Sequence, residues 1–133
     1  MKKGYKADIE KLTKENTNFR KVLYTGEHSQ LVLMSLLPGE DIGSEVHPDN
    51  DQFFRFDEGT GKAVINGTEY EVSDGDAVVV PKGAEHNVIN TGEGSLKFYT
   101  IYMPPHHKDG IVRNTKADAT ANEEEYDGVT TEQ

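Results

Sequence analysis

Hydrophobic and polar residues alternate in short runs through the centre of the chain, a pattern that is typical of β-strands. The run from Gln30 to Leu37 is almost continuously apolar, which predicts a central, buried strand. Asn66-Gly67 predicts a hairpin, because both residues of such a turn need positive φ. We expect strands at residues 21–25, 30–37, 62–65, 68–72, 77–80, 86–90 and 96–103, and one more that begins at Gln52.

These strands are short, turns separate them at near-regular spacing, and no helical period interrupts them, so the sequence predicts an all-β sandwich or barrel. The pattern stops on both sides of this region. Residues 1–19 are polar and of mixed charge, and residues 114–133 contain almost no large apolar side chain. We therefore predict an N-terminal arm at 1–19, a barrel at 20–105, and a polar, partly disordered tail at 106–133. A short surface helix is the alternative within that tail.

Along the strand that begins at Gln52, alternation predicts that Phe54 and Phe56 share its face and that Phe53 and Arg55 face the other way. Arg55, Tyr99 and Tyr102 are candidates to orient a ligand.

Composition narrows the possible partners. The net charge is −10, from 14 Lys and Arg against 24 Asp and Glu, which disfavours nucleic acid and anionic membrane surfaces. The absence of cysteine excludes disulfides, thiolate metal sites and cysteine nucleophiles. No apolar run approaches the roughly 18 residues of a membrane span, and the first residues lack the apolar stretch of a signal peptide. We expect a single-domain, cytoplasmic protein.

Four side chains suited to metal binding fall into two stretches. Glu45 and His47 are two residues apart, so a strand would place them side by side on one face. Residues 48–51 (PDND) predict a turn, after which Gln52 can return beside that pair. His86 follows a Pro-Lys-Gly turn and begins another alternating run. If these strands are neighbours, two imidazoles, a carboxylate and an amide meet.

The first stretch resembles a motif of the cupin family, G-x5-H-x-H-x3-4-E-x6-G. Its spacing is kept, but Glu45 stands where the family usually has its first His, and Gln52 where it usually has Glu. Some family members use that glutamate as a general base, which an amide cannot be. If this protein is an enzyme, the base must be Glu45, a metal-bound hydroxide or a residue that the sequence does not identify. The matching positions are Gly39, Glu45, His47, Gln52 and Gly59.

The second stretch resembles the other cupin motif, G-x5-P-x-G-x2-H-x3-N, at every position. The resemblance covers about residues 20–105 and implies a double-stranded β-helix, the jelly-roll or cupin barrel. Short bacterial proteins of this kind carry a mannose-6-phosphate isomerase-like label, which is an analogy of fold. The matching positions are Gly75, Pro81, Gly83, His86 and Asn90.

The predicted cofactor is one divalent transition metal ion, held by Glu45, His47, Gln52 and His86. Two His and one carboxylate leave coordination positions open, an arrangement typical of Fe(II) oxygenases. Fe, Mn, Ni, Co and catalytic Zn are all compatible with these ligands. The alternative is a site that has become a hydrogen-bonded polar cluster.

Several functions remain open. The first is a metal-dependent enzyme acting on an unidentified small molecule, with oxygenase chemistry ahead of sugar-phosphate isomerisation because Gln52 removes the usual base. The second is a module that binds or senses a small molecule without catalysis, and a structural or storage role is the weakest.

Two further features outside the motifs concern surfaces. Phe53, Tyr99 and Tyr102 make both faces of their strands apolar, which predicts a homodimer. His106-His107 resembles a second metal pair, but neighbours in an extended segment point to opposite sides, which favours a surface pair.

Overall fold

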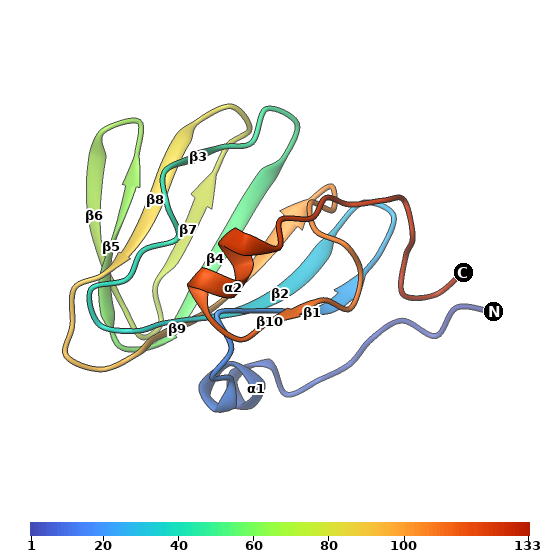
Figure 1. The fold of residues 1–133 in the computed structure, drawn as a ribbon, viewed down its shortest axis with the longest axis horizontal. Coiled ribbons are helices and arrows are strands. Elements are labelled where there is room, and N and C mark those ends of the chain that lie inside the picture. Colours follow the sequence, from blue (N-terminus) through green and yellow to red (C-terminus); the bar gives the residue numbers. More distant parts are fainter.

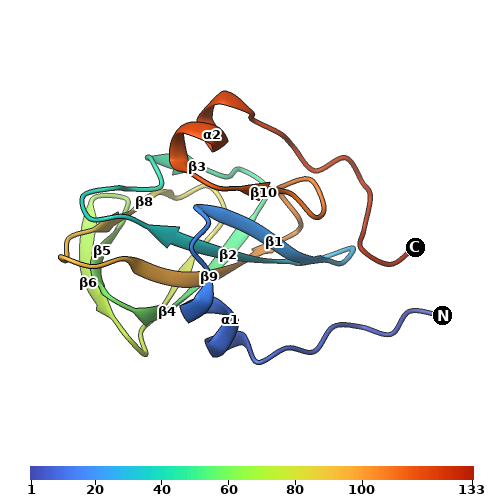
Figure 2. The ribbon, with the colours of Figure 1, turned by 60° about the horizontal axis from the view of Figure 1, so that its bottom comes forward.

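The computed structural model describes residues 1–133, which form mainly β-strands. Two antiparallel sheets face each other, and two short helices lie outside them (Figures 1 and 2). The elements are α1 (Ile9–Glu15), β1 (Arg20–Thr25), β2 (Gln30–Leu36), β3 (Glu45–Val46), β4 (Asp51–Glu58), β5 (Thr60–Ile65), β6 (Thr68–Ser73), β7 (Ala77–Val80), β8 (Glu85–Asn90), β9 (Leu96–Met103), β10 (Val112–Arg113) and α2 (Lys116–Ala121).

The six-stranded sheet has the order β10-β1-β2-β9-β4-β7, and the four-stranded sheet has the order β3-β8-β5-β6. β2 lies between β1 and β9 and is buried along almost its whole length, as its apolar run predicted. Strands distant in sequence are neighbours in both sheets, as a double-stranded β-helix requires. The predicted all-β fold is thus confirmed.

Alternation along β4 decides which of its side chains enter the barrel. Gln52, Phe54 and Phe56 are buried inside, whereas Phe53 and Arg55 are half-buried on the outer face, as the two-residue period of a strand predicts.

A cluster of phenylalanines forms the centre of the core. The ring centroids of Phe56 and Phe98 are 5.2 Å apart, and those of Phe54 and Phe98 are 5.8 Å apart. All three rings are fully buried, and complete burial of such a side chain contributes about 1.5–3 kcal/mol. Side chains of both sheets complete the core, among them Val32 on β2 and Val88 on β8.

Tight turns connect the strands where the sequence predicted them. Asn66 and Gly67 both have positive φ, 47° and 83°, and join β5 to β6. Gly59 has φ of 91°, and a Cβ there would lie 2.4 Å from the carbonyl oxygen of Ser95. A side chain at this position of the first motif would therefore collide with the β8–β9 loop.

The N-terminal arm contains α1, which packs against β2, β4 and β9. Asp8 caps it by accepting a hydrogen bond from the backbone N–H of Lys11. Leu33, which alternation places on the outer face of β2, is also buried, and α1 packs against that strand. Neither helix of the structure has the length and hydropathy needed to cross a membrane.

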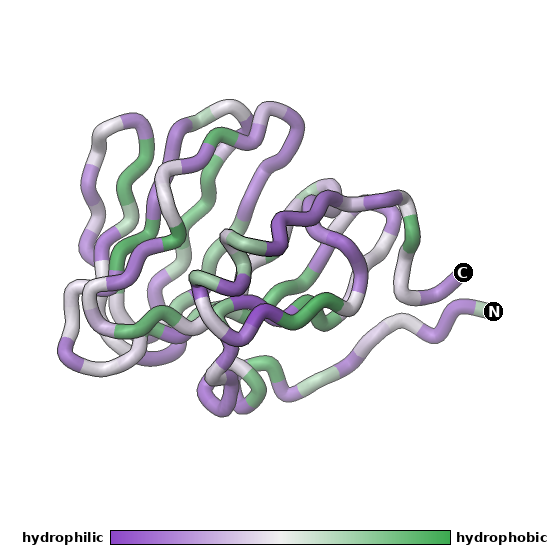
Figure 3. The backbone as a smooth tube through the Cα atoms, in the orientation of Figure 1, coloured by the Kyte–Doolittle hydropathy of each residue, from purple (hydrophilic) through white to green (hydrophobic).

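The segment after residue 105, expected to be a polar and partly disordered tail, contributes β10 and α2. β10 pairs with β1 and so extends the sheet past the predicted boundary, and α2 is a short helix of the kind considered as the alternative. The two terminal segments are mostly hydrophilic and run side by side (Figures 1 and 3). The carboxylate of Glu132 accepts hydrogen bonds from the backbone N–H groups of Lys3 and Gly4.

Candidate metal centre

Three of the four predicted ligands meet at one end of the barrel. β3 pairs with β8 so that Glu45 lies opposite His86, and His47 follows β3 directly. One potential ligand atom from each of the three lies within 4.8 Å of the others. Nε2 of His47 is 2.9 Å from a carboxylate oxygen of Glu45. Both imidazoles are buried, while the Glu45 side chain is 32% exposed, so this group can be reached from one side.

The Pro-Lys-Gly turn of the second motif joins the two stretches. The backbone N–H of Gly83 donates a hydrogen bond of 2.9 Å to the carbonyl of His47. Nδ1 of His86 is 3.2 Å from the carbonyl oxygen of Ala84, and we assign the ring proton to this nitrogen, since a carbonyl only accepts. Nε2 of His86 then carries a free lone pair and has no hydrogen-bond partner although it is buried.

Gln52, the fourth predicted ligand, lies on β4 and is 1% exposed. Its amide nitrogen donates to the hydroxyl of Thr100, at 2.9 Å, which leaves the amide oxygen on the other side of the group. That oxygen is buried and has no hydrogen-bond partner. An unpartnered buried acceptor is unfavourable by about 1–3 kcal/mol, so Gln52 and His86 both present a lone pair that calls for a Lewis acid or a donor.

The electrostatic surroundings suit cation binding. Burial alone would raise the pKa of Glu45, but the hydrogen bond and charge of His47, together with Arg20 and His86, hold it below its usual value. Burial lowers the pKa of His86. At neutral pH the centre therefore offers a carboxylate and a neutral His86 imidazole, which are the protonation states that metals bind.

His106 and Tyr102 form a wall beside this group. The ring centroid of His106 is 4.3 Å from that of His47 and 5.3 Å from that of Tyr102. Burial, then the neighbouring His107 and His47, lowers the pKa of His106 to about 4, so it is neutral at pH 7. Burial raises the pKa of Tyr102, which keeps its hydroxyl protonated.

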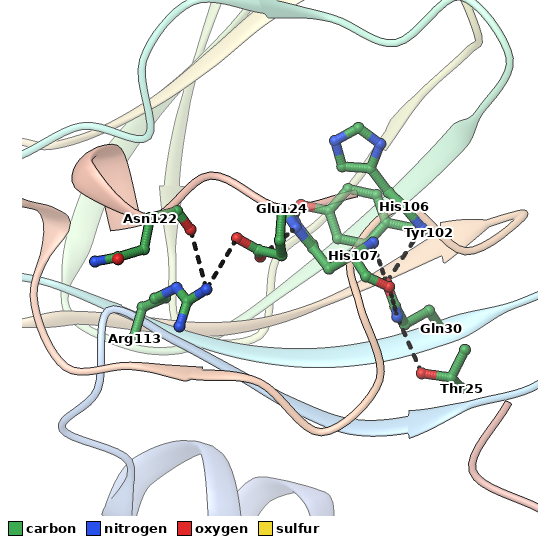
Figure 4. Close-up of polar contacts among 8 residues, drawn as sticks. All are labelled: Thr25, Gln30, Tyr102, His106, His107, Arg113, Asn122 and Glu124. Carbon is green, nitrogen blue, oxygen red and sulfur yellow. Dashed lines mark hydrogen bonds and ion pairs between the residues drawn. The ribbon is translucent and has the colours of Figure 1, made fainter. Parts of the chain in front are cut away.

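The backbone of His106 and His107 is held by one buried amide. The side-chain oxygen of Gln30 accepts from both of their N–H groups, and its nitrogen donates to the His107 carbonyl and to Thr25 (Figure 4). The expectation of a surface pair is therefore wrong: His107 is 5% exposed, and the two rings are 4.8 Å apart. The segment bends here instead of continuing as a strand, so the rule for extended neighbours does not apply.

The C-terminal segment closes over this wall from the other side. A carboxylate oxygen of Glu124 lies 3.3 Å from Nδ1 of His107, and the other lies 3.4 Å from Arg113 (Figure 4). Nε2 of His107 is 3.1 Å from the hydroxyl of Tyr102. Burial would raise the pKa of Glu124, but His107, Arg20 and Arg113 hold it below the usual value. A chain of polar contacts thus connects the tail to Tyr102, whose ring centroid lies 5.8 Å from that of His47.

A cavity of about 700 Å³ separates the barrel mouth from α2 and the tail. This volume is in the usual range for small-molecule sites. Glu45 and His106 line its inner end, and Lys116, Ala119 and Thr120 of α2 line its outer wall. Figure 2 shows α2 outside the barrel. The complete lining is Phe19, Arg20, Ile42, Glu45, His106, His107, Lys116, Ala119, Thr120, Glu123, Glu124 and Glu125.

Of the residues suggested to orient a ligand, only Tyr102 faces inward. Arg55 and Tyr99 pair across the outer face, and Arg55 lies 3.7 Å from Asp57. Sequence reasoning missed Arg20 and Glu124, which line the cavity from opposite ends of the chain. No local motif marks either residue, because they reach the site through the pairing of β1 with β10 and the path of the tail.

Comparison with known proteins adds three close similarities. A family model described as the cupin domain matches residues 32–102. The uncharacterized protein YrkC of Bacillus subtilis (strain 168) is 48% identical over 128 residues, covering 92% of this chain and 69% of YrkC. The uncharacterized protein L612 of Acanthamoeba polyphaga mimivirus is 42% identical over 112 residues, covering 81% of this chain and 70% of L612.

Among solved structures, that of BH2720 from Bacillus halodurans superposes with a TM-score of 0.88 at 46% sequence identity. The match covers 90% of this chain and 96% of BH2720, so the terminal segments outside the barrel are largely included.

Proposed function

This chain belongs to the cupin family, and from that premise we propose that it binds one divalent transition metal ion through Glu45, His47, Gln52 and His86 and acts on a small molecule in the adjoining cavity. One observation carries the proposal: Nε2 of His86, whose ring meets Glu45 and His47 in the cluster, and the amide oxygen of Gln52 on β4 are both buried without partners. A decayed site would be expected to satisfy these atoms with hydrogen bonds.

The ligand set supports some chemistries better than others. Bound there, a redox-active ion such as Fe(II) would supply open coordination positions for O₂ and substrate. Proton-transfer isomerisation needs a base beside the substrate carbon, and the only cavity-lining carboxylate in the cluster is Glu45, itself a proposed ligand. Oxygenase chemistry therefore ranks ahead of sugar-phosphate isomerisation, and binding without catalysis is the remaining alternative.

This chain's residues would prepare the site in three ways. The carbonyl of Ala84 holds the Nδ1 proton of His86, and the hydroxyl of Thr100 accepts a hydrogen bond from the amide nitrogen of Gln52. Tyr102 and His106 exclude water from one side of His47. Such supporting contacts typically change metal affinity by about 10–100-fold.

The test is to measure metal content in the purified protein and then to reload the metal-free protein separately with Fe(II), Mn(II), Ni(II) and Zn(II). We expect about one ion per chain by elemental analysis. Each form is screened with phenols and diketones under O₂ and with sugar phosphates without O₂. Protein that neither contains nor takes up metal would refute the proposal. Turnover of a sugar phosphate by the Zn(II) form alone would reverse the ranking of reactions.

We also propose a homodimer that forms through the outer face of the six-stranded sheet. Leu31, Ile101, Phe53 and Val79 are register neighbours across β2, β9, β4 and β7, and Val79 is 62% exposed. The Phe53 and Tyr99 rings pack 6.2 Å apart on the same face. Sedimentation of wild type and Val79→Lys at micromolar concentration tests this: a wild-type monomer would contradict it.

A further inference from the structure

The cavity contains one cation that the fold leaves unpaired. Arg20, at the start of β1, lines the cavity together with Glu45 and His106. Its guanidinium forms no ion pair and no hydrogen bond, and its Nε is buried without a partner. The guanidinium carbon lies 5.4 Å from the centroid of the Phe19 ring. A guanidinium offers five donors in a planar fork, so an important hydrogen-bonding capacity is unused here.

The other basic groups near the cavity are already occupied. Lys116, which lines the outer wall, forms an ion pair with Asp41, and Arg113 pairs with Glu124. Arg20 acts electrostatically on Glu45 and Glu124, yet neither carboxylate approaches within ion-pair distance of it. The fork of Arg20 is thus available to a molecule in the cavity.

The charges that line the cavity indicate the sign of the charge on that molecule. A divalent ion at the metal centre would exceed the single charge of Glu45, and Arg20 adds to this excess at the inner end. The acidic groups that could offset it, Glu123 and Glu125, are exposed at the tail side of the cavity. An anion at the inner end is therefore favoured, and the acidic rim favours a small one of low charge.

The number of unpaired basic side chains indicates whether the anion is a carboxylate or a phosphate. Phosphate recognition usually recruits several basic groups, whereas only Arg20 is unpaired here. A carboxylate needs one guanidinium, which binds it with two parallel hydrogen bonds.

We propose that Arg20 is the carboxylate-binding residue of the cavity and that the ligand is a small carboxylic acid with a second oxygen donor directed at the metal centre. This inference rests on the proposed function, because the second oxygen of the ligand would coordinate the metal ion proposed there.

The test measures ligand binding by calorimetry, independently of any reaction. Pyruvate and lactate, which carry a carboxylate and an adjacent oxygen, are titrated into metal-loaded and metal-free protein. Methyl pyruvate lacks the charge and is the matched ligand control, and inorganic phosphate tests the other anion. We expect Arg20→Gln to weaken pyruvate binding by about tenfold or more, as for a lost charge-assisted hydrogen bond, and Arg20→Lys to restore part of it.

Lys21→Gln is the matched protein control, since it removes the same charge from an exposed neighbour on β1; it should bind pyruvate as wild type does. Metal content, measured in parallel, separates the two proposals. Protein that takes up no metal but binds pyruvate in a way that depends on Arg20 would refute the metal centre and support the role of Arg20. With metal-loaded protein, any of three results would refute the proposed role of Arg20 in carboxylate binding. These are equal affinity for pyruvate and its methyl ester, unchanged pyruvate affinity in Arg20→Gln, and tighter binding of phosphate than of pyruvate.

Discussion

The two ends of the barrel interior are built from the same strands but have opposite character. Toward one end, Gln30, Tyr102 and Gln52 are register partners across β2, β9 and β4. Further along these three strands, the inward-facing side chains become mainly apolar. The last of them are fully buried leucine and phenylalanine side chains. On the opposite sheet, β8 changes in the same way from His86 to Val88.

The two ends differ in whether their buried polar atoms have hydrogen-bond partners. Near the apolar end, Asn90 donates to the carbonyls of Leu36 and Gly94 and accepts from Gly92, so its amide is satisfied. At the polar end, His86 and Gln52 keep unpartnered atoms. The first arrangement stabilises the fold, and the second leaves lone pairs that the proposed metal ion would use. Stability and binding should therefore respond to changes at different ends.

The largest expected effect is on stability, at the apolar end. Phe98→Ala removes a ring that packs against Phe54 and Phe56 and should lower the free energy of unfolding by about 3–5 kcal/mol in denaturant titrations. Phe98→Leu, a milder change, should leave metal affinity within a few-fold of wild type. Loss of metal from folded Phe98→Leu protein would contradict the separation of the two ends.

At the polar end, His86→Ala and His47→Ala should each lower metal affinity by about a hundredfold or more, equivalent to about 2.8 kcal/mol. Competition with a coloured chelator measures this loss. His28, which is exposed in the β1–β2 turn, supplies the control, because His28→Ala removes an imidazole that is not part of the cluster and should bind metal normally. Equal losses in all three variants would remove the basis for the proposed centre.

Gln52→Ala should have a smaller effect, about tenfold in metal affinity, since a neutral amide oxygen is the weakest of the four donors. Gln52→Glu should bind metal more tightly than wild type, because it restores a charged oxygen. The same chelator competition applies to both variants. Unchanged affinity in both would mean that Gln52 does not bind the ion.

The smallest effect concerns Asp57 on β4, beyond the phenylalanines. Burial raises its pKa, and Arg55, 3.7 Å away, offsets this only in part. The folded state therefore holds the proton to higher pH than the unfolded chain does, and stability falls as pH rises through the raised pKa. Asp57→Asn should increase the unfolding free energy at pH 7 by about 1 kcal/mol. The gain should shrink as pH falls toward 3.8, the ordinary value. Glu58→Gln, an exposed neighbour, should show neither change.

Local sequence determined most of the barrel. The two-residue period along β4 gave the inward positions of Gln52, Phe54 and Phe56, and the Asn66-Gly67 turn was predicted because few residues accept positive φ at both positions. The spacing of Glu45 and His47 placed both beside His86 once their strands were paired. These features depend on neighbours within a few residues, which is why a sequence alone specifies them.

Tertiary structure decided what surrounds that cluster. Arg20 enters the cavity because β10 and the tail cover the start of β1, and His107 is buried because Gln30, 77 residues away in sequence, holds its backbone. Glu124 arrives from a segment whose polar composition predicted no fixed position. Each of these placements arises from contacts between distant parts of the chain. Composition and periodicity describe only local preferences, so they could supply the proposed metal ligands but not the walls of the cavity.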